Sequence, residues 1–400
     1  MTGMMLVFGI FFTLSCTSLQ TTSKNAETLY NENNYRAALE TIDNEILEDP
    51  DNSEKKILKA RILNAHAMND RGPSDRNQLY NNLRNTVDEI QFSTDQFNTE
   101  TDSILNTAWL HEQSEGVRYL QQNGPDNFDL HFDRVISHFS NAITIIPDSL
   151  VTYNLKATTY YRHGDLTKAI ETLESIEDKG FNRPPDTCEK LAYLYLEAGM
   201  IDRSIEIYEG LASNYPESEI YRQGLVNAYI LGDNHQKSIE LLETLSEEFP
   251  NRAEYREALA TERFYQLKNE ADDLKLESNE SDRTLGEIEY FSDSLNEITG
   301  IYHDVDGALP STEERKQRIA EFHLSAADLL TGLAGTNQES ELNQLAASES
   351  EMQLRHAIPY LIALFESNAD NVVYARKLID LYNDLDMDDE AEALERQINL

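Results

Sequence analysis

Residues 150–252 contain three consecutive segments that align without gaps: LVTYNLKATTYYRHGDLTKAIETLESIEDKGFNR (150–183), PDTCEKLAYLYLEAGMIDRSIEIYEGLASNYPES (185–218) and EIYRQGLVNAYILGDNHQKSIELLETLSEEFPNR (219–252). The segments repeat with a period of about 34 residues. Small residues and tyrosines recur at matching places, namely Ala157, Ala192 and Val226 in the first half, Ala169, Ser204 and Ser238 in the second half, and Tyr160, Tyr195 and Tyr229. This recurrence indicates one structural unit used three times.

A turn signal divides each segment into two helices. The turns are rich in Gly, Asp and Asn, which favour reversals of the chain, and lie at Gly164–Asp165, Glu197–Gly199 and Gly232–Asn234. Pro216 and Pro250 end the second helices, because proline disfavours helix at the residue before it and cannot donate a backbone hydrogen bond. Each segment is therefore predicted to be a helical hairpin whose small residues let the two helices approach closely.

This arrangement resembles the tetratricopeptide repeat (TPR), a helix–turn–helix unit that stacks on its neighbours. The resemblance implies an all-α fold in which helix-turn-helix TPR-like repeats form a right-handed superhelical solenoid. Weaker copies of the pattern flank the three segments, at Leu29–Asn52 and Val135–Ser149 before them and at Val372–Leu400 after them. The chain has only 16 Gly and 10 Pro in 400 residues, which agrees with long helices.

The expected organisation follows from these boundaries. It comprises a signal peptide (1–15), a lipidated cysteine with a polar tether (16–24), degenerate TPR-like helices (25–149), three well-formed TPR repeats (150–252), an irregular helical bridge (253–340) and C-terminal TPR-like helices (341–400). Pro359 is expected either in the first turn of a helix or at a kink.

The chain is strongly acidic, with 73 Asp and Glu against 33 Lys and Arg and a formal net charge of −40. Such a field repels phosphate backbones, so we expect no nucleic-acid binding. It also disfavours a domain that lies flat on anionic lipid. A solvated surface, a saline habitat and a basic partner are all compatible with this charge.

The start of the chain has the character of a secretory signal. Met4 to Leu14 reads MMLVFGIFFTL, which is too short to span a bilayer, since that takes about 20 residues, but suits the apolar region of a signal peptide. The triplet Leu14–Ser15–Cys16 resembles the lipobox of bacterial lipoproteins. That resemblance implies cleavage before Cys16, with acyl chains on its sulfur that anchor the protein in a membrane.

Two features keep other interpretations of this segment open. Thr13 stands where the lipobox usually has leucine, and the first basic residue is Lys24, after the apolar run. A conventional cleaved signal and an uncleaved anchor are therefore the alternatives. Cys16 is followed by Thr17 and not by Asp. In sorting of the enterobacterial type, this resembles the signal for an outer-membrane destination. We expect a protein of the cell envelope, lipid-anchored at the outer membrane and facing the periplasm or the surface.

The first helix of each repeat should line a concave partner-binding face. From the repeat register, its lining residues are Asn154, Thr158, Tyr161, Arg162, Glu189, Tyr193, Glu197, Gln223, Asn227 and Ile230. Such side chains could hold an extended peptide or a partner helix. Alternatively, Tyr161 and Tyr193 pack against neighbouring repeats. Asn154 and Asn227 suit the carboxylate clamp of some TPR proteins, but the lysines that complete it are absent.

The sequence contains no strong pattern for catalysis or cofactor binding. The nine histidines are scattered without the spacing of a metal site, and Cys188 is expected to be a buried structural thiol. Asp384–Glu395 partly matches a calcium loop, but Asp389 replaces the required glycine. We therefore expect no metal, no cofactor and no enzymatic activity.

The sequence thus predicts a non-catalytic scaffold or adaptor, tethered to the bacterial envelope, that binds partner proteins or peptides in a concave TPR groove. An envelope complex is the expected partner. The alternative is a glycan-capturing outer-membrane lipoprotein of the starch-utilisation type, which also contains TPR helices. Those proteins are usually rich in tryptophan, whereas this chain has one, Trp109. An enzyme with helical repeats would need a catalytic domain, for which the sequence leaves no segment.

Overall fold

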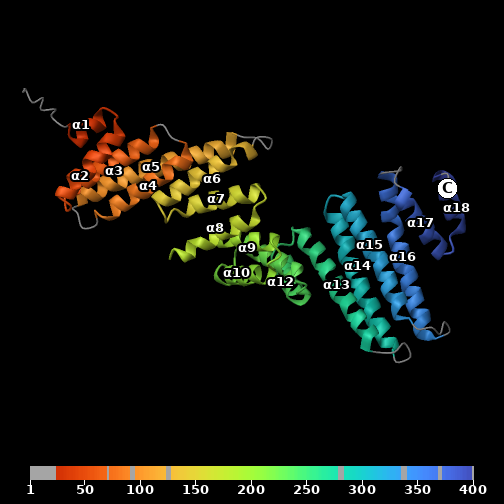
Figure 1. The fold of residues 1–400 in the computed structure, drawn as a ribbon. Coiled ribbons are helices and arrows are strands. Elements are labelled where there is room, and N and C mark those ends of the chain that lie inside the picture. Colours follow the sequence, from red (N-terminus) through yellow and green to blue (C-terminus); the bar gives the residue numbers. More distant parts are fainter. Residues whose placement is uncertain are drawn as a thin grey trace, which may run out of the picture. The chain divides into compact units, whose positions relative to one another are not determined.

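A computed structural model describes residues 24–69, 72–90, 95–122, 128–277, 283–334, 340–367 and 372–398. The expected signal peptide and Cys16 lie outside the described residues. Every described element is a helix (Figure 1), so the predicted all-α fold is confirmed. None of these helices has both the length and the apolar character needed to cross a membrane. The chain divides into two units, Met1–Thr187 and Cys188–Leu400, and we describe each by itself.

The first unit is built from helices that pack as neighbours in the sequence. They are α1 (Ala26–Asn31), α2 (Tyr35–Glu48), α3 (Ser53–Met68), α4 (Pro73–Asp88), α5 (Asp95–Gln122), α6 (Phe128–Ile145), α7 (Leu150–Arg162) and α8 (Leu166–Asp178). In addition, α3 packs against α5 and α4 against α6, so these four helices form one group. Its core contains Tyr80 and Leu83 of α4, both with no exposed surface.

Ten helices among the described residues belong to the second unit, which begins within α9, after Thr187. They are α9 (Pro185–Glu197), α10 (Ile201–Asn214), α11 (Glu219–Leu231), α12 (His235–Glu248), α13 (Ala253–Glu277), α14 (Leu285–Ala308), α15 (Glu313–Leu333), α16 (Glu341–Ser367), α17 (Val372–Asp384) and α18 (Asp388–Ile398). Pro359 lies well inside α16 and not in a first turn, which leaves the other alternative of the expectation, a kink.

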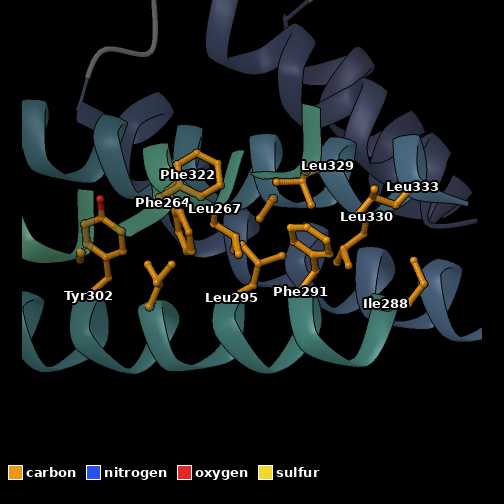
Figure 2. Close-up of a cluster of buried hydrophobic side chains, with 14 of the residues drawn as sticks. Phe264, Leu267, Ile288, Phe291, Leu295, Tyr302, Phe322, Leu329, Leu330 and Leu333 are labelled. Carbon is orange, nitrogen blue, oxygen red and sulfur yellow. The ribbon is translucent and has the colours of Figure 1, made fainter. Parts of the chain in front are cut away.

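Long helices replace short hairpins in the middle of the second unit. α13, α14 and α15 contain 25, 24 and 21 residues, against 13 or 14 in α9 to α12. Their apolar faces meet in one cluster (Figure 2), in which the ring of Phe322 lies 5.0 Å from that of Phe264 and 4.9 Å from that of Tyr302. Burial of these large side chains is the main term that stabilises this part of the fold.

The hairpins share one type of turn, which follows from their sequences. The residue that reverses the chain has a left-handed φ in each case: Asn33 (61°), Gly164 (84°), Gly199 (70°), Asp233 (53°) and Asp386 (55°). Glycine, asparagine and aspartate tolerate this region best. The next amide then bonds back to a carbonyl five residues earlier, as in Asp165 N to Tyr160 O at 2.9 Å and Asn234 N to Tyr229 O at 2.9 Å.

The predicted small residues lie where the paired helices touch. All six, from Ala157 to Ser238, are buried. Ser204 also donates a hydrogen bond from its Oγ to the carbonyl oxygen of Ala192, at 2.9 Å, across the hairpin. A larger side chain at these positions would push the helices apart, which explains why the repeat pattern depends on them.

Candidate interaction surface

Helix α11 exposes four residues at helical spacing, Ile220, Gln223, Asn227 and Leu231, which we call the α11 face. Ile220 and Leu231 are 66% and 57% exposed, and the two amides between them are exposed as well. The opposite side of the helix is buried through Leu225, Val226, Ala228 and Tyr229. The α11 face therefore combines two large apolar side chains with two hydrogen-bonding groups.

Sequence reasoning found only part of this face. Gln223 and Asn227 were expected to line a surface, whereas Ile220 and Leu231 were not among the expected residues. The signal was their spacing: Ile220 lies three residues before Gln223, and Leu231 four residues after Asn227. Ile230, also expected to line the surface, packs partly buried against the core cluster of α11, α12 and α13.

Charged groups at the start of α11 are paired within the unit. The Tyr255 hydroxyl donates to Glu219 at 2.7 Å, and Arg252 lies 3.4 Å from the same carboxylate. Burial, together with the hydrogen bond to Glu219, raises the pKa of Tyr255 to about 12. Arg222 is buried and lies 2.7 Å from a carboxylate oxygen of Glu248. These charges are neutralised locally, so the α11 face itself is neutral.

The residues expected on α9 lie on a helix that shares a core cluster with α11. Tyr193 is 40% exposed and Glu197 is exposed, whereas Glu189 is half-buried. Burial, and then the charge of Glu189, raises the pKa of Tyr208 in that cluster. The structure thus brings the α9 and α11 residues into one unit, with an acidic edge on α9 and a neutral face on α11.

The residues expected on α7 belong to the first unit, and the side chains of two of them form hydrogen bonds within that unit. The side-chain amide of Asn154 donates to Thr187 Oγ1 at 2.9 Å, and Thr158 Oγ1 donates to the Asn154 carbonyl oxygen at 2.7 Å. Arg162 is exposed, and Tyr161 is 37% exposed. Of the four expected residues, only the two at the C-terminal end of α7 are therefore exposed.

Residues 190–261 match the tetratricopeptide repeat family. The chain contains a tetratricopeptide repeat domain. TPR domains serve in general as protein-interaction scaffolds and are typically non-catalytic. The α11 face lies inside the matched residues, on the first helix of a repeat. No curated protein matches the chain.

Solved structures, TPR proteins among them, resemble the chain at low identity. A TPR repeat-containing protein from Cytophaga hutchinsonii is 13% identical, with 73% of this chain and 97% of that chain covered and a TM-score of 0.39. A TPR protein from Parabacteroides merdae is 10% identical, with coverages of 81% and 95% and a TM-score of 0.34. A chain of the Naa15/Naa10 complex bound to HypK is 13% identical, with a TM-score of 0.35. The match covers 93% of this chain but only 62% of that one.

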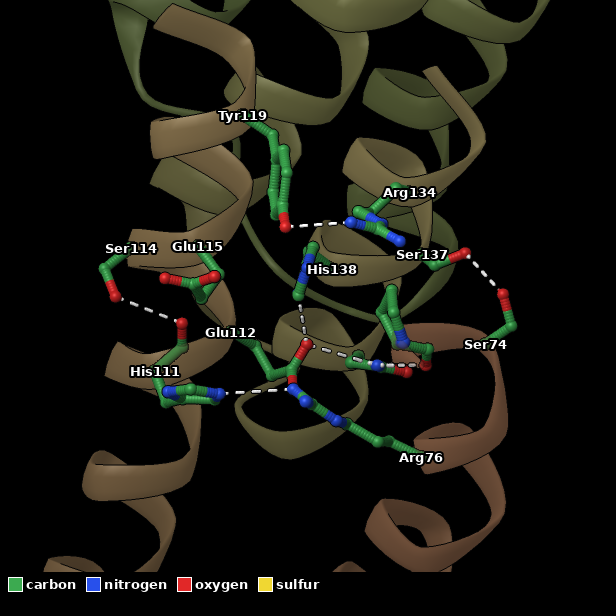
Figure 3. Close-up of polar contacts among 12 residues, drawn as sticks. Ser74, Arg76, His111, Glu112, Ser114, Glu115, Tyr119, Arg134, Ser137 and His138 are labelled. Atoms are coloured by element: carbon green, nitrogen blue, oxygen red, sulfur yellow. Dashed lines mark hydrogen bonds and ion pairs between the residues drawn. The ribbon is translucent and has the colours of Figure 1, made fainter. Parts of the chain in front are cut away.

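A buried glutamate joins three helices of the first unit through a polar network (Figure 3). Glu112 of α5 has no exposed surface. Its Oε1 accepts hydrogen bonds from Arg76 Nη1 at 2.8 Å and from the Tyr80 hydroxyl at 2.9 Å. Its Oε2 lies 2.7 Å from His138 Nδ1 and accepts from Asn141 Nδ2 at 3.2 Å. One carboxylate thus connects α4, α5 and α6.

The electrostatics of this network fit a structural role. Burial raises the pKa of the Glu112 carboxyl, but hydrogen bonds from His138 and Arg76 outweigh burial and hold that pKa below its usual value. Burial, followed by the Glu112 charge, raises the pKa of Tyr80. Glu112 is therefore a fixed anion and Tyr80 a fixed hydrogen-bond donor near neutral pH. Sequence reasoning missed the network because its members lie far apart in the chain.

The remaining candidates from the sequence are the histidines, Cys188 and the calcium-loop segment. In the described part of the chain, no cluster of three His, Cys, Asp or Glu side chains is arranged to hold a metal ion. His131 and His138 both lie on α6, with ring centroids 5.6 and 5.8 Å from that of Tyr119. Cys188 is partly rather than fully buried, against the α9–α11 core cluster. The calcium-loop candidate, residues 384–395, comprises the last residue of α17, the turn with Asp386 at its left-handed position, and most of α18.

Proposed function

We propose that this chain is a non-catalytic scaffold of the bacterial envelope, anchored by lipid on Cys16, whose TPR domain binds a partner protein through the α11 face. The observation that carries the proposal is the exposed position of Ile220 and Leu231 at the two ends of that face. The apolar residues gain free energy when a partner covers them, by about 25 cal/mol for each Å² removed from water. An envelope complex supplies the partner.

The chemistry of the face defines the partner surface. Gln223 and Asn227 each carry a donor and an acceptor, so they can bond either to an extended backbone or to polar side chains of a helix. The net charge of −40 favours a basic or neutral partner and repels an acidic one. Glu197, exposed on α9, adds to that preference.

The surroundings of the single tryptophan give little support to the alternative function, glycan capture. Trp109 is partly buried and packs against the core cluster of α3, α4 and α5. Its indole N–H faces the hydroxyls of Ser149 at 3.1 Å and Thr152 at 3.2 Å. A tryptophan held in this way serves the core of the first unit and offers little ring surface to a sugar.

Site-specific crosslinking in cells tests the proposed surface. A photoreactive benzoylphenylalanine at Asn227 is expected to give a defined protein adduct, whereas the same group at Glu206, exposed on α10, is expected to give none. Adding Ile220→Glu should abolish the Asn227 adduct. Leu276→Glu, at a leucine of α13 that is 85% exposed, should leave the adduct intact.

Two results would contradict the proposal. Equal adducts from the probes at Asn227 and Glu206 would mean that the α11 face has no special role. Binding on a glycan array by the purified chain, without a protein adduct in cells, would favour glycan capture instead.

A further inference from the structure

A cavity of about 250 Å³ lies in the first unit, between α6, α7 and α8. Three lysines line it: Lys156 on α7, Lys168 near the start of α8 and Lys179 just after its end. The rings of Tyr153 and Tyr160 line it as well. The space is several times the volume of one water molecule, about 30 Å³ in the liquid, and can hold a small organic molecule.

Lys156 is the central group of this cavity. Its side chain is half-buried, and no carboxylate among the described residues pairs with it. Its Nζ lies 6.0 Å from the centroid of the Tyr160 ring. Burial, and then repulsion from Lys179, lowers the pKa of Lys156. A partly desolvated ammonium without a counter-ion is unfavourable, so an anion in the cavity would lower the free energy of the folded chain.

The other two lysines are held at the cavity by neighbouring groups. Lys179 Nζ donates to the Tyr153 hydroxyl at 2.8 Å. Lys168 Nζ lies 2.7 Å from a carboxylate oxygen of Asp165 and 5.7 Å from the centroid of the Tyr160 ring. Both ammonium groups are thus positioned before any ligand arrives, which reduces the entropy lost on binding.

The charge of the lining is the reverse of the charge of the chain. Three ammonium groups and one carboxylate, that of Glu171, line it, and the Asp165 carboxylate beside Lys168 still leaves an excess of one positive charge. The whole chain has more than two acidic residues for each basic one. A local excess of positive charge in such an acidic protein attracts small anions to this place and not to the surrounding surface.

The cavity does not belong to the surface expected to bind partner proteins. Tyr153, Lys156 and Tyr160 share one face of α7, because their spacings of three and four residues match the helical repeat. Asn154, Thr158 and Tyr161 fall on another face of the same helix, about a third of a turn away. The cavity therefore opens on the α6 and α8 side of the repeat.

We propose that this cavity binds the oxyanion group, a carboxylate or a phosphate, of a small organic ligand. Lys156 provides the uncompensated charge, Lys168 and Lys179 add charge-assisted hydrogen bonds, and the tyrosine rings contact the remainder of the ligand. Binding of this kind gives the scaffold a second site that is separate from the α11 face.

Calorimetric titration of the full chain with sodium phosphate, and separately with sodium succinate, tests the proposal and distinguishes the two anion types. One saturable site is expected for at least one probe. Lys156→Met should weaken binding about tenfold or more, since a hydrogen bond to a charged group is lost. The control Lys59→Met removes a lysine of α3 that pairs with Asp43 at 2.8 Å, and should leave the affinity unchanged. Absence of binding by both probes, or equal weakening in both variants, would overturn the proposal.

A second measurement, by nuclear magnetic resonance, monitors the lysine side chains without removing any charge. After ¹³C-methylation of the wild-type chain, which keeps the amines cationic, the methyl resonances of Lys156, Lys168 and Lys179 should shift when the binding anion is added. The resonance of Lys59 should stay in place. Equal shifts of all four would indicate general screening by salt and would end the proposal, whether or not Lys156→Met folds.

Discussion

The ring of Tyr208 in α10 packs directly on Gly224 in α11, and a Cβ atom at residue 224 would overlap that ring. Tyr208 is 3% exposed and belongs to the core cluster that joins α9, α10 and α11, so it cannot easily move away. Gly224→Ala is therefore expected to lower the free energy of unfolding by about 1–3 kcal/mol through overpacking. Urea denaturation followed by circular dichroism measures the change.

Gly210→Ala is the matched control for that substitution. Gly210 lies in the neighbouring helix α10, and a Cβ there would meet no atom within 4 Å. Because alanine favours helix over glycine, Gly210→Ala should raise the free energy of unfolding by about 0.5–1 kcal/mol. A stabilising effect at both positions would contradict the packing described for Gly224.

Loss of the buried charge at Glu112 should be strongly destabilising. Glu112→Gln removes the carboxylate charge that lies 2.8 Å from Arg76, whose side chain is 12% exposed. Breaking a buried pair in this way costs about 3–5 kcal/mol. Glu115→Gln, three residues along the same helix, removes a partly exposed pair with Arg118 and should cost less than about 1 kcal/mol. Similar melting temperatures for the two variants would refute the structural role of Glu112.

The second unit should lose stability in mild acid because of His323. Burial lowers the pKa of His323 to about 4, against the opposing effect of the hydrogen bond with Gln353, whereas an unfolded histidine titrates near 6.5. Below pH 6.5 the unfolded chain takes up the proton first. The stability that the neutral, buried His323 contributes is therefore fully present above pH 6.5 and is lost as the pH falls towards 4.

Between pH 7 and pH 5 this linkage amounts to about 2 kcal/mol. His323→Gln should remove that part of the pH dependence, measured as the difference in urea midpoint between the two pH values. His303→Gln, at an exposed histidine of α14, should keep the dependence of the wild type. An unchanged pH dependence in His323→Gln would show that this histidine is not buried neutral.

The two cysteines allow a direct test of the lipid anchor. Cells that express the wild type or Cys188→Ala should incorporate labelled palmitate into the protein, whereas Cys16→Ala should not. Label in all three proteins, or in none, would discard acylation at Cys16.

The helical hairpins could be predicted from the sequence because their determinants are local. Gly164 and Gly199 mark turns that only a few residue types can form, and Pro216 ends a helix by removing a donor. The weaker copies near the two ends have the same turn, at Asn33 and Asp386.

The polar network and the lysine cavity could not be predicted, because they depend on which helices meet. Arg76 and Glu112 are 36 residues apart, and no periodicity connects them. Lys156 gave no signal in the sequence, because its burial depends on the docking of α6 and α8 around it. Likewise, Asn154 was expected on a binding surface, and only the position of Thr187 makes it part of the fold.

The separation between Arg76 and Glu112 also has a kinetic consequence. Each hairpin closes over a few residues, so α7–α8 or α11–α12 can form early and independently during refolding. The Glu112 carboxylate acquires its partners only when α4, α5 and α6 have docked. The slowest step in refolding the first unit should therefore be the assembly of these three helices.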